Sequence, residues 1–334
     1  MNGERPVRIM VVKPGWFTTV QDLGRYEYQR YGVSVSGAMD RRSCILANRL
    51  VGNGDQAALL EITLKGPELL FENDAVIAVT GADLTPSVNG SNMPLWTSVL
   101  VKADSRLTFG ARRSGARCYL AIAGGIDVPV VMGSRSTHRS SRTGGFKGRA
   151  LAKGDILIGG APAPHQRATI GCALRERLRP VYSTVTTLRV LPGPQLASFA
   201  PQAFDFLTTS PYRLSSQSDR MGYCLEGSKL VYAGFVGNEH TQAESLHVIS
   251  DGTAMGALQV PPDGRPILLM ADRQTTGGYP IIAVVISADL HLAGQLLPGE
   301  TVVFKAATLS EAQAAIKAQW NEMNRTNPPS RITL

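Results

Sequence analysis

Short runs of apolar residues, separated by glycine, proline, asparagine and aspartate, dominate the pattern of the chain. In the first half they lie at 8–13, 74–80, 98–103, 106–109, 117–123 and 155–160. In the second half they lie at 187–192, 229–234, 246–250, 256–261, 267–271, 281–287 and 301–304. Short runs bounded by turn residues predict β-strands, and their spacing favours a sandwich or barrel over alternating βαβ units. We therefore predict a mainly β protein.

Few segments have helical character. The best is 40–53, where Asp40 can cap the first turn and Gly52 can end the helix. A terminal helix is expected at 310–325 and a weaker one at 195–207.

The chain is long enough, at 334 residues, for two domains. The segment 159–180, rich in proline, alanine and arginine, is the natural boundary between them. We predict an N-terminal β domain at 1–160, a linker at 161–185, a C-terminal β domain at 186–308, and a terminal helix with a tail at 309–334.

The composition, 43% hydrophobic and 18% charged, is typical of a globular protein. No apolar run reaches the about 18 residues that a membrane helix needs, and the first residues lack the apolar core of a signal peptide. We therefore expect a cytoplasmic protein with no membrane partner. The cysteines form no CxxC pair, so we expect buried reduced thiols rather than disulfides or metal ligands: Cys44, Cys118, Cys172 and Cys224.

Motifs of several enzyme classes are missing from the sequence. It contains no GxxxxGK[ST], no GxGxxG after the first predicted strand, no GxSxG and no HExxH. A P-loop nucleotide site, a dinucleotide-binding fold, an esterase elbow and a zinc-protease helix are therefore not expected. A lysine between two methionines, the attachment site of biotin, is also missing, so the chain is not expected to carry its own biotin.

The formal net charge of +8 has a local source. Segment 133–149 carries five arginines and lysines and no acid, and 175–179 carries three arginines. Nucleic acid is one partner for such charge, but no recognition helix, zinc finger or aromatic–basic pattern accompanies it, and we expect none. A loop that grips phosphate or carboxylate groups is one interpretation of 133–149, and a merely solvated loop is the other.

Three polar segments border the predicted strands: 18–41, 215–227 and 272–280. The third joins the apolar runs 267–271 and 281–287 and is longer than a simple hairpin needs. Its two adjacent glycines allow a close approach of the backbone to an anion or a carbonyl oxygen. A ligand-binding loop is therefore favoured over a plain turn.

The other two polar segments have structural alternatives. In 18–41, Asp22 can pair with Arg25 and Asp40 can cap the following helix, although the cluster as a whole favours a ligand wall. In 215–227, a turn with a surface ion pair is as plausible as an apolar surface for a planar ligand.

A family resemblance is carried by motifs that occur in order from residue 18 to residue 280: TTVQDLGR, SGAMD, ANRLVGN, LEITLKGPELLF, GGIDVP, GSRSTH, GGFKGRALAKGD, SDRMGY and ADRQTTGGYP. Together they resemble the family variously called allophanate hydrolase subunit 2, biotin-dependent carboxyltransferase, KipA-like protein or the 5-oxoprolinase C subunit. The resemblance implies two cyclophilin-like β-barrel domains with few helices, in line with the strand-rich pattern.

The resemblance implies three functions. The leading expectation is the C subunit of an ATP-dependent 5-oxoprolinase, which opens 5-oxoproline to glutamate in complex with the A and B subunits. The first alternative is a carboxyltransferase subunit that moves carboxyl from biotin on a separate chain to a urea-like acceptor. The second is a non-enzymatic antagonist that binds a homologue of the B subunit, a KipI-like kinase inhibitor. All three imply a partner of the B-subunit (KipI-like) type, and the first also implies an A subunit.

Both enzymatic branches bind a small amide-like substrate, which needs neutral hydrogen-bonding groups and one acid or base. The candidate catalytic acids are Asp22, Asp219 and Asp272. The candidate substrate-binding residues are Arg25, Ser36, Asp40, Arg220, Tyr223, Gln259, Arg273, Gln274, Thr275, Gly277, Gly278 and Tyr279. If ATP phosphorylates the lactam oxygen, the phosphate contacts are expected from Arg135, Arg139 and Arg142. No metal is expected, and the three polar segments are expected to converge on a cleft between two β domains.

Overall fold

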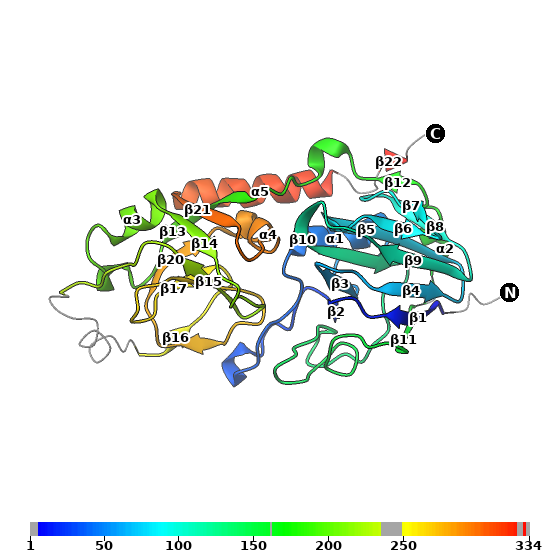
Figure 1. Cartoon of the computed structure of the whole chain (residues 1–334), viewed down its shortest axis with the longest axis horizontal. Coiled ribbons are helices and arrows are strands. Elements are labelled where there is room, and N and C mark those ends of the chain that lie inside the picture. The colour runs from blue at the N-terminus through cyan, green and yellow to red at the C-terminus, as the bar shows by residue number, and fades with distance from the viewer. Residues whose placement is uncertain (1–5, 161, 235–248, 326–329, 332–334) are drawn as a thin grey trace. The chain divides into compact units, whose positions relative to one another are not determined.

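The computed structural model describes residues 6–160, 162–234, 249–325 and 330–331 (Figure 1). The chain divides into two compact units. The first comprises Met1–Tyr26, Ser36–Tyr182 and Trp320–Leu334, and the second comprises Glu27–Val35 and Ser183–Gln319. The change between units at Tyr182 falls inside the segment expected to be a linker, 161–185.

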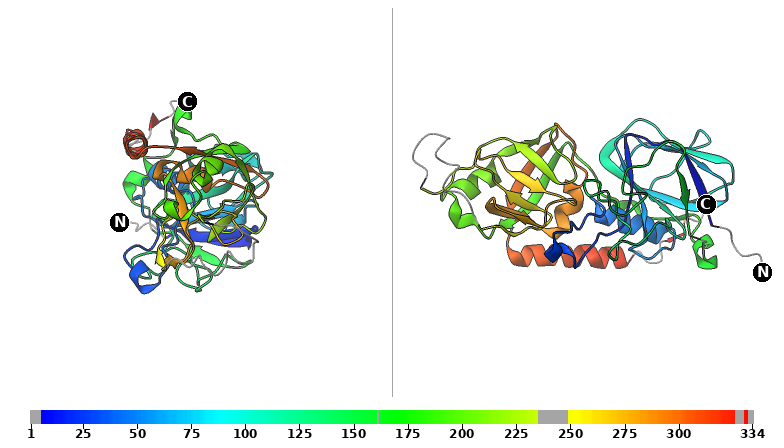
Figure 2. Two further views of the ribbon diagram at one scale, coloured as in Figure 1. Left: turned by 90° about the vertical axis from the view of Figure 1, so that its left-hand side faces the viewer. Right: turned by 90° about the horizontal axis from the view of Figure 1, so that it is seen from below.

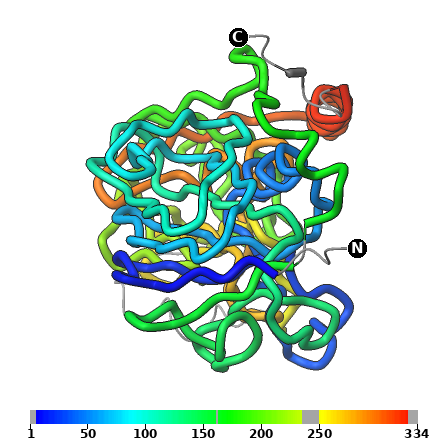
Figure 3. The backbone as a smooth tube through the Cα atoms, turned by 90° about the vertical axis from the view of Figure 1, so that its right-hand side faces the viewer, coloured from blue at the N-terminus to red at the C-terminus, as the bar shows by residue number. Residues whose placement is uncertain are grey.

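Two antiparallel sheets form the first unit. The six-stranded sheet has the order β11-β1-β4-β9-β6-β7, with β1 (Arg8–Lys13), β4 (Glu68–Phe71), β6 (Pro86–Val88), β7 (Ser91–Asn92), β9 (Ser105–Phe109) and β11 (Ile156–Ile158). The five-stranded sheet has the order β2-β3-β10-β5-β8, with β2 (Phe17–Gln21), β3 (Leu59–Thr63), β5 (Ala75–Asp83), β8 (Ser98–Val101) and β10 (Ser114–Ile122). Apolar side chains of both sheets share one buried cluster, which includes Ile9, Phe71, Ile77 and Leu120. In Figure 3, β1 is the dark blue segment, and β11, its antiparallel neighbour, is green.

Helix α1 (Arg41–Leu50) packs against β5 and β10. It begins where the sequence predicts, because the Asp40 carboxylate accepts the Ser43 N–H at 2.9 Å and so satisfies one of the unpaired donors of the first turn. Its buried Cys44 and Leu50 pack in a cluster with Tyr119. The predicted helix at 40–53 and its cap are thus confirmed. The remaining elements of this unit are short: α2 (Pro164–Arg167), β12 (Cys172–Ala173), η2 (Glu176–Leu178) and β22 (Ser330–Arg331).

A closed seven-stranded barrel forms the second unit, with the order β13-β20-β17-β18-β15-β14-β21 (Figure 2). Its strands are β13 (Val185–Pro192), β14 (Pro211–Leu214), β15 (Gly222–Glu226), β17 (Ala257–Gln259), β18 (Ile267–Leu269), β20 (Ile281–Val285) and β21 (Thr301–Ala306). All neighbours are antiparallel except β13 and β21, which run parallel. Closure leaves the barrel with no open sheet edge.

Short elements surround this barrel. Helix α3 (Ala203–Thr209) packs against β21, and α4 (Leu290–Ala293) packs against β13. A two-stranded ribbon pairs β16 (Asp251–Gly252) with β19 (Thr276–Gly277). The others are η1 (Gln29–Tyr31), η3 (Leu196–Ser198), η5 (Ser287–Asp289) and α5 (Leu309–Asn324), of which residues up to Gln319 belong to this unit.

The predicted mainly β fold with few helices is confirmed, and the barrel of the second unit matches the expected architecture. One predicted strand is wrong: in 229–234 only Tyr232 forms an isolated bridge, to Phe199, on whose ring it stacks at 4.7 Å. The predicted strand at 246–250 lies mainly outside the described residues. The weak helix at 195–207 is replaced by η3 and α3.

The thiols are buried as predicted for three of the four cysteines, and Cys224 is half-buried. Burial raises the pKa of the Cys44 and Cys118 thiols far above the ordinary range, so neither is a nucleophile at neutral pH. In the part of the chain that the structure describes, no helix is long and apolar enough to cross a membrane.

Candidate functional site

The loop 272–280 of the second unit is more than a turn between β18 and β20. Its Thr276 and Gly277 form β19, which pairs with β16, and the Thr253 N–H donates to the Thr275 carbonyl at 3.0 Å. The hydroxyl of Thr253 also donates to the Gln274 carbonyl. The extra length that the sequence shows is therefore used to build a second, smaller ribbon beside the barrel.

Gln259 of β17 lies under this loop and is 2% exposed. Its Nε2 donates to the Tyr279 carbonyl at 3.2 Å, and its Oε1 accepts from Gln274 Nε2 at 3.0 Å. Gly277 approaches so closely that a Cβ there would lie 2.4 Å from Gln259 Nε2. The loop thus brings two side-chain amides together, and only glycine leaves room for the contact.

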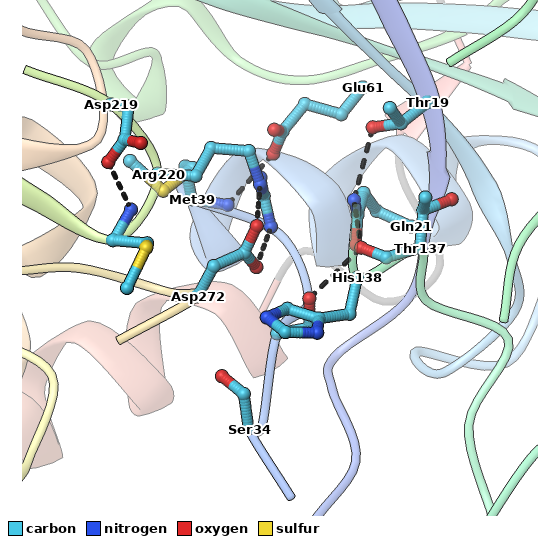
Figure 4. A network of polar contacts seen from close by, with 12 residues as sticks. Thr19, Gln21, Ser34, Met39, Glu61, Thr137, His138, Asp219, Arg220 and Asp272 are labelled. Atoms are coloured by element: carbon cyan, nitrogen blue, oxygen red, sulfur yellow. Dashed lines mark hydrogen bonds and ion pairs between the residues drawn. The ribbon is translucent and has the colours of Figure 1, made fainter. Parts of the chain in front are cut away.

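A buried ion pair joins this loop to the turn before β15 (Figure 4). Arg220 Nε and Nη2 each lie 2.9 Å from one oxygen of Asp272, and both residues are buried. The Asp272 N–H also donates to the Arg220 carbonyl at 2.8 Å. This fork-to-fork geometry fixes the two segments, which are 52 residues apart in sequence, in one arrangement.

Asp219, the neighbour of Arg220 in sequence, takes no part in this ion pair. Its side chain is exposed, and its Oδ1 accepts the Met221 N–H at 2.7 Å and the Gly222 N–H at 3.4 Å. Its Oδ2 has no hydrogen-bond partner among the described residues. Of the three predicted acids, Asp219 alone combines exposure to solvent with an uncommitted oxygen.

Ser34 supports the same loop from a segment that the sequence analysis did not connect with it. Its hydroxyl donates to the Arg273 carbonyl at 2.8 Å, while Arg273 Nε donates to the Thr253 carbonyl at 3.3 Å. Both contacts lie within the second unit, because Glu27–Val35 belongs to it. No local pattern signals a contact between residues 239 positions apart.

The remaining predicted residues of this unit differ in accessibility. Tyr223 is 1% exposed, whereas Tyr279 is 46% exposed. Thr275 and Gly278 are half-buried within the loop. Tyr279 is therefore the aromatic side chain of the predicted set that a ligand can reach, while Tyr223 belongs to the barrel core.

In the first unit, Asp22 and Arg25 organise the segment that follows β10. The Asp22 carboxylate accepts from the Ser134 hydroxyl at 2.7 Å, from the Ser136 hydroxyl and from the Arg135 N–H at 2.5 Å. Arg25 donates to the carbonyls of Val131 and Ser136 at 3.0 and 2.9 Å. Both side chains are buried, so their observed contacts are structural.

Ser36 and Asp40 are buried in a neighbouring network of the first unit. Ser36 donates to the Thr137 carbonyl at 3.0 Å, and Asp40 caps α1. Figure 4 also shows Gln21, whose Nε2 donates to the same Thr137 carbonyl at 3.1 Å.

A buried acid that the sequence analysis missed, Glu61, lies in β3 of this unit. It accepts from the Met39 N–H at 2.8 Å and from the Tyr119 hydroxyl at 2.9 Å. Burial, followed by the nearby Glu61 charge, raises the pKa of Tyr119 well above its ordinary value. Tyr119 therefore stays a hydrogen-bond donor to Glu61, and its oxygen accepts from the Asp40 N–H at 2.7 Å.

The three arginines predicted to contact phosphate have separate environments. Arg135 Nε donates to the Val128 carbonyl at 2.9 Å, and Arg139 lies over the ring of Phe17, 6.0 Å from its centre. Arg142 lines a pocket of about 460 Å³ within the first unit. Within the described ranges, no group of three or more His, Cys, Asp or Glu side chains is arranged to hold a metal ion.

Comparison with known proteins identifies relatives across nearly the whole chain. Residues 31–306 match the family model described as carboxyltransferase domain, subdomain A and B. The C subunit of Escherichia coli 5-oxoprolinase is 39% identical over 314 residues, which is 93% of this chain and 95% of that protein. The corresponding C subunit of Haemophilus influenzae is 34% identical over 88% of this chain and 89% of its own length.

Larger proteins also match. Urea amidolyase of Saccharomyces cerevisiae is 34% identical over 94% of this chain, a region that is 17% of the yeast protein. The crystal structure of Kluyveromyces lactis urea amidolyase aligns with a TM-score of 0.88 at 33% identity, covering 99% of this chain and 20% of that one. The family match and these relatives, together with the mainly β architecture, show that the chain belongs to the carboxyltransferase-domain family that is also represented by the 5-oxoprolinase C subunit.

Proposed function

We propose that this chain is the C subunit of an ATP-dependent 5-oxoprolinase and opens 5-oxoproline to glutamate together with the A and B subunits. The observation that carries the proposal is the match to the C subunit of Escherichia coli 5-oxoprolinase, which covers 95% of that protein at 39% identity. The Haemophilus influenzae protein of the same name supports it with 89% coverage. The urea amidolyase relatives are matched over 17% or 18% of their length.

The chemistry of the loop 272–280 supports an amide-like substrate. A lactam presents one N–H donor and one carbonyl acceptor, and the loop contributes neutral groups of both kinds through Gln274, Thr275 and its own backbone. The Arg220–Asp272 pair neutralises the two charges beside the loop. These neutral groups suit the lactam ring of 5-oxoproline, and Arg273 of the same loop is the candidate partner for the carboxylate that 5-oxoproline also carries.

Asp219 is our choice for the acid or base of the reaction. A general base must be accessible to the substrate and must have a free lone pair, and Asp219 is exposed with no hydrogen bond to its Oδ2 among the described residues. Asp272 has both oxygens bound to Arg220, and Asp22 has both oxygens bound by serine hydroxyls or backbone N–H groups. These two acids support the site by positioning segments.

The test is reconstitution. The chain is mixed with the A and B subunits, and the release of glutamate from 5-oxoproline is measured with and without ATP. Release that needs all three proteins and ATP is the expected result. A stable complex that releases no glutamate overturns the proposal, and it favours a partner-binding antagonist if the same chain relieves an inhibitory activity of the B subunit.

A carboxyltransferase is the second candidate, because the Kluyveromyces lactis urea amidolyase structure aligns over 99% of this chain. The corresponding test supplies carboxybiotin on a separate carrier protein and urea as the acceptor, and follows loss of carboxyl from the carrier. Urea-dependent loss without glutamate release from 5-oxoproline would favour this candidate over the first.

A further inference from the structure

A pocket of about 460 Å³ lies within the first unit, and none of its lining residues belongs to the loop 272–280. Its walls come from three segments: 127–131, 142–148 and β11. The volume falls in the range of small-molecule sites, about 300–1,000 Å³. None of the residues assigned to 5-oxoproline in the proposed function lines it.

Apolar side chains make most of the pocket wall, and they come from all three segments: Val128, Pro129, Val131, Phe146, Ile156 and Ile158. Apolar walls of this extent favour the carbon skeleton of a ligand over water. Ile156 is 39% exposed, although it is a large apolar residue in a strand, and a bound ligand would cover part of it.

The charged groups of the pocket are mostly positive. Arg142 and Lys147 are exposed, and neither has an ion pair with an acid in the described part of the chain. The one acid of the lining, Asp127, lies 3.8 Å from the guanidinium of Arg135, which is outside the lining. Arg142 and Lys147 therefore line a pocket whose single carboxylate is already shared with Arg135. Lys147 Nζ lies 5.3 Å from the centre of the Phe146 ring in the same lining.

The backbone places both cations at a conformational cost. Arg142 and Lys147 have φ of 51° and 56°, in the left-handed region that side chains rarely adopt. Gly148, with φ of 66°, directly follows Lys147 and packs back on Arg142, so that a Cβ there would lie 2.0 Å from the Arg142 carbonyl oxygen. The tight turn brings the two cations, five residues apart, into one pocket lining.

We propose that this pocket binds a small organic anion, with an apolar body against the walls and a carboxylate held by Arg142 and Lys147. A guanidinium and an ammonium match one carboxylate through charge-assisted hydrogen bonds. The apolar walls give no partner for the hydration shell of a bare inorganic ion, so the ligand is organic. This site is independent of the proposed reaction at the loop 272–280.

The test uses benzoate as the probe, benzamide as its neutral twin and inorganic phosphate as an anion without an apolar body. Binding is followed on the full chain by the shifts of backbone amide NMR signals. Benzoate is expected to move the signals of residues 142–148 and to bind about tenfold more tightly than benzamide or phosphate. Equal affinity for benzoate and benzamide, or shifts confined to other residues, would overturn the proposal.

Variants then test whether Arg142 and Lys147 supply the positive charge that binds benzoate. Arg142→Gln and Lys147→Gln are each expected to weaken benzoate binding by about three- to tenfold. Lys153→Gln, an exposed lysine outside the lining, is the matched control and is expected to bind benzoate as the parent does. Unchanged affinity in both pocket variants contradicts the assignment.

If benzoate fails to bind and the two pocket variants instead lose the B subunit in a pull-down, the surface is a protein-docking site and the small-anion proposal is wrong.

Discussion

The loop 272–280 and the basic segment 133–149 look alike in sequence, since each is polar, glycine-containing and placed next to predicted strands. In the structure the two segments differ in whether their charged side chains form ion pairs. In the first, Arg220 and Asp272 form a buried, bidentate pair. In the second, Arg142 and Lys147 line a pocket, and neither forms an ion pair with an acid among the described residues. Charges paired within the protein stabilise a loop, and unpaired charges beside a pocket remain available to a ligand.

The largest effect that tests this contrast is expected from Asp272→Ala. The substitution leaves Arg220 buried beside a cavity, and breaking such a pair costs about 3–5 kcal/mol in the free energy of unfolding. Urea denaturation measures it. The matched control is Asp219→Asn, an exposed position, which should change stability by less than about 0.5 kcal/mol. Equal losses in the two variants would show that the buried pair does not hold the loop.

Gly277→Ala should come next in size. The new Cβ would meet Gln259 Nε2 at 2.4 Å, and the amide must move away from the Tyr279 carbonyl. Displacing a buried side chain in this way costs about 1–3 kcal/mol. Gly252→Ala, in the opposite strand of the same ribbon, is the control, because no atom lies within 4 Å of its Cβ position. Hydrogen exchange of the ribbon amides should increase only in the Gly277 variant.

The basic segment also contains an arginine, Arg149, that forms a close ion pair with Asp155, and this pair gives a pH-dependent prediction. Asp155 accepts from Arg149 at 2.7 and 2.8 Å, and these hydrogen bonds hold the pKa of Asp155 below its ordinary value. A lowered folded-state pKa stabilises the protein above the unfolded-state pKa of about 3.9, and the contribution is lost as the pH falls through the folded-state value.

Asp155→Asn should therefore lower stability at neutral pH by about 1 kcal/mol, because Arg149 is partly exposed and solvent screens the pair. The difference between variant and parent should shrink as the pH is lowered below about 4. Thermal denaturation between neutral and acidic pH measures this. A constant difference at all pH values would mean that the loss comes from packing and not from the ion pair.

The smallest effect is expected from Arg142→Gln in the absence of ligand. Since Arg142 is exposed and has no acidic partner among the described residues, its loss should change the free energy of unfolding by less than about 0.5 kcal/mol. The same denaturation assay applies. A loss as large as that of Asp272→Ala would show that Arg142 is a structural residue and would remove the contrast between the two loops.

The sequence predicts what depends on local patterns. Short apolar runs bounded by turn residues locate most of the barrel strands, and Asp40 before an amphipathic run locates the start of α1. Strand β2, with the sequence FTTVQ, was not predicted because most of its side chains are polar. The polar side chains Thr18, Thr19 and Gln21 are nevertheless buried. Hydrogen bonds satisfy their polar groups, because Thr18 donates to the Pro14 carbonyl and Gln21 donates to the Thr137 carbonyl.

The site was predictable only in part, because its contacts join distant segments. The polar segments drew attention to Arg220 and Asp272, but nothing local shows that they pair with each other. The support that Ser34 gives to the loop through Arg273 had no sequence signal at all. Glu61 was missed because its strand, β3, was not among the predicted strands and because a glutamate is seldom fully buried.

The most direct test of the account is glutamate release from 5-oxoproline by the complex of the A and B subunits with either the parent chain or Asp219→Asn. The asparagine keeps an oxygen for the N–H groups of Met221 and Gly222 but removes the base. The account predicts ATP-dependent release by the parent complex and a loss of about 10²–10⁴-fold in kcat for the variant, with complex formation unchanged. A parent complex that forms but releases no glutamate would contradict the proposed function, and full activity of the variant would contradict the role of Asp219.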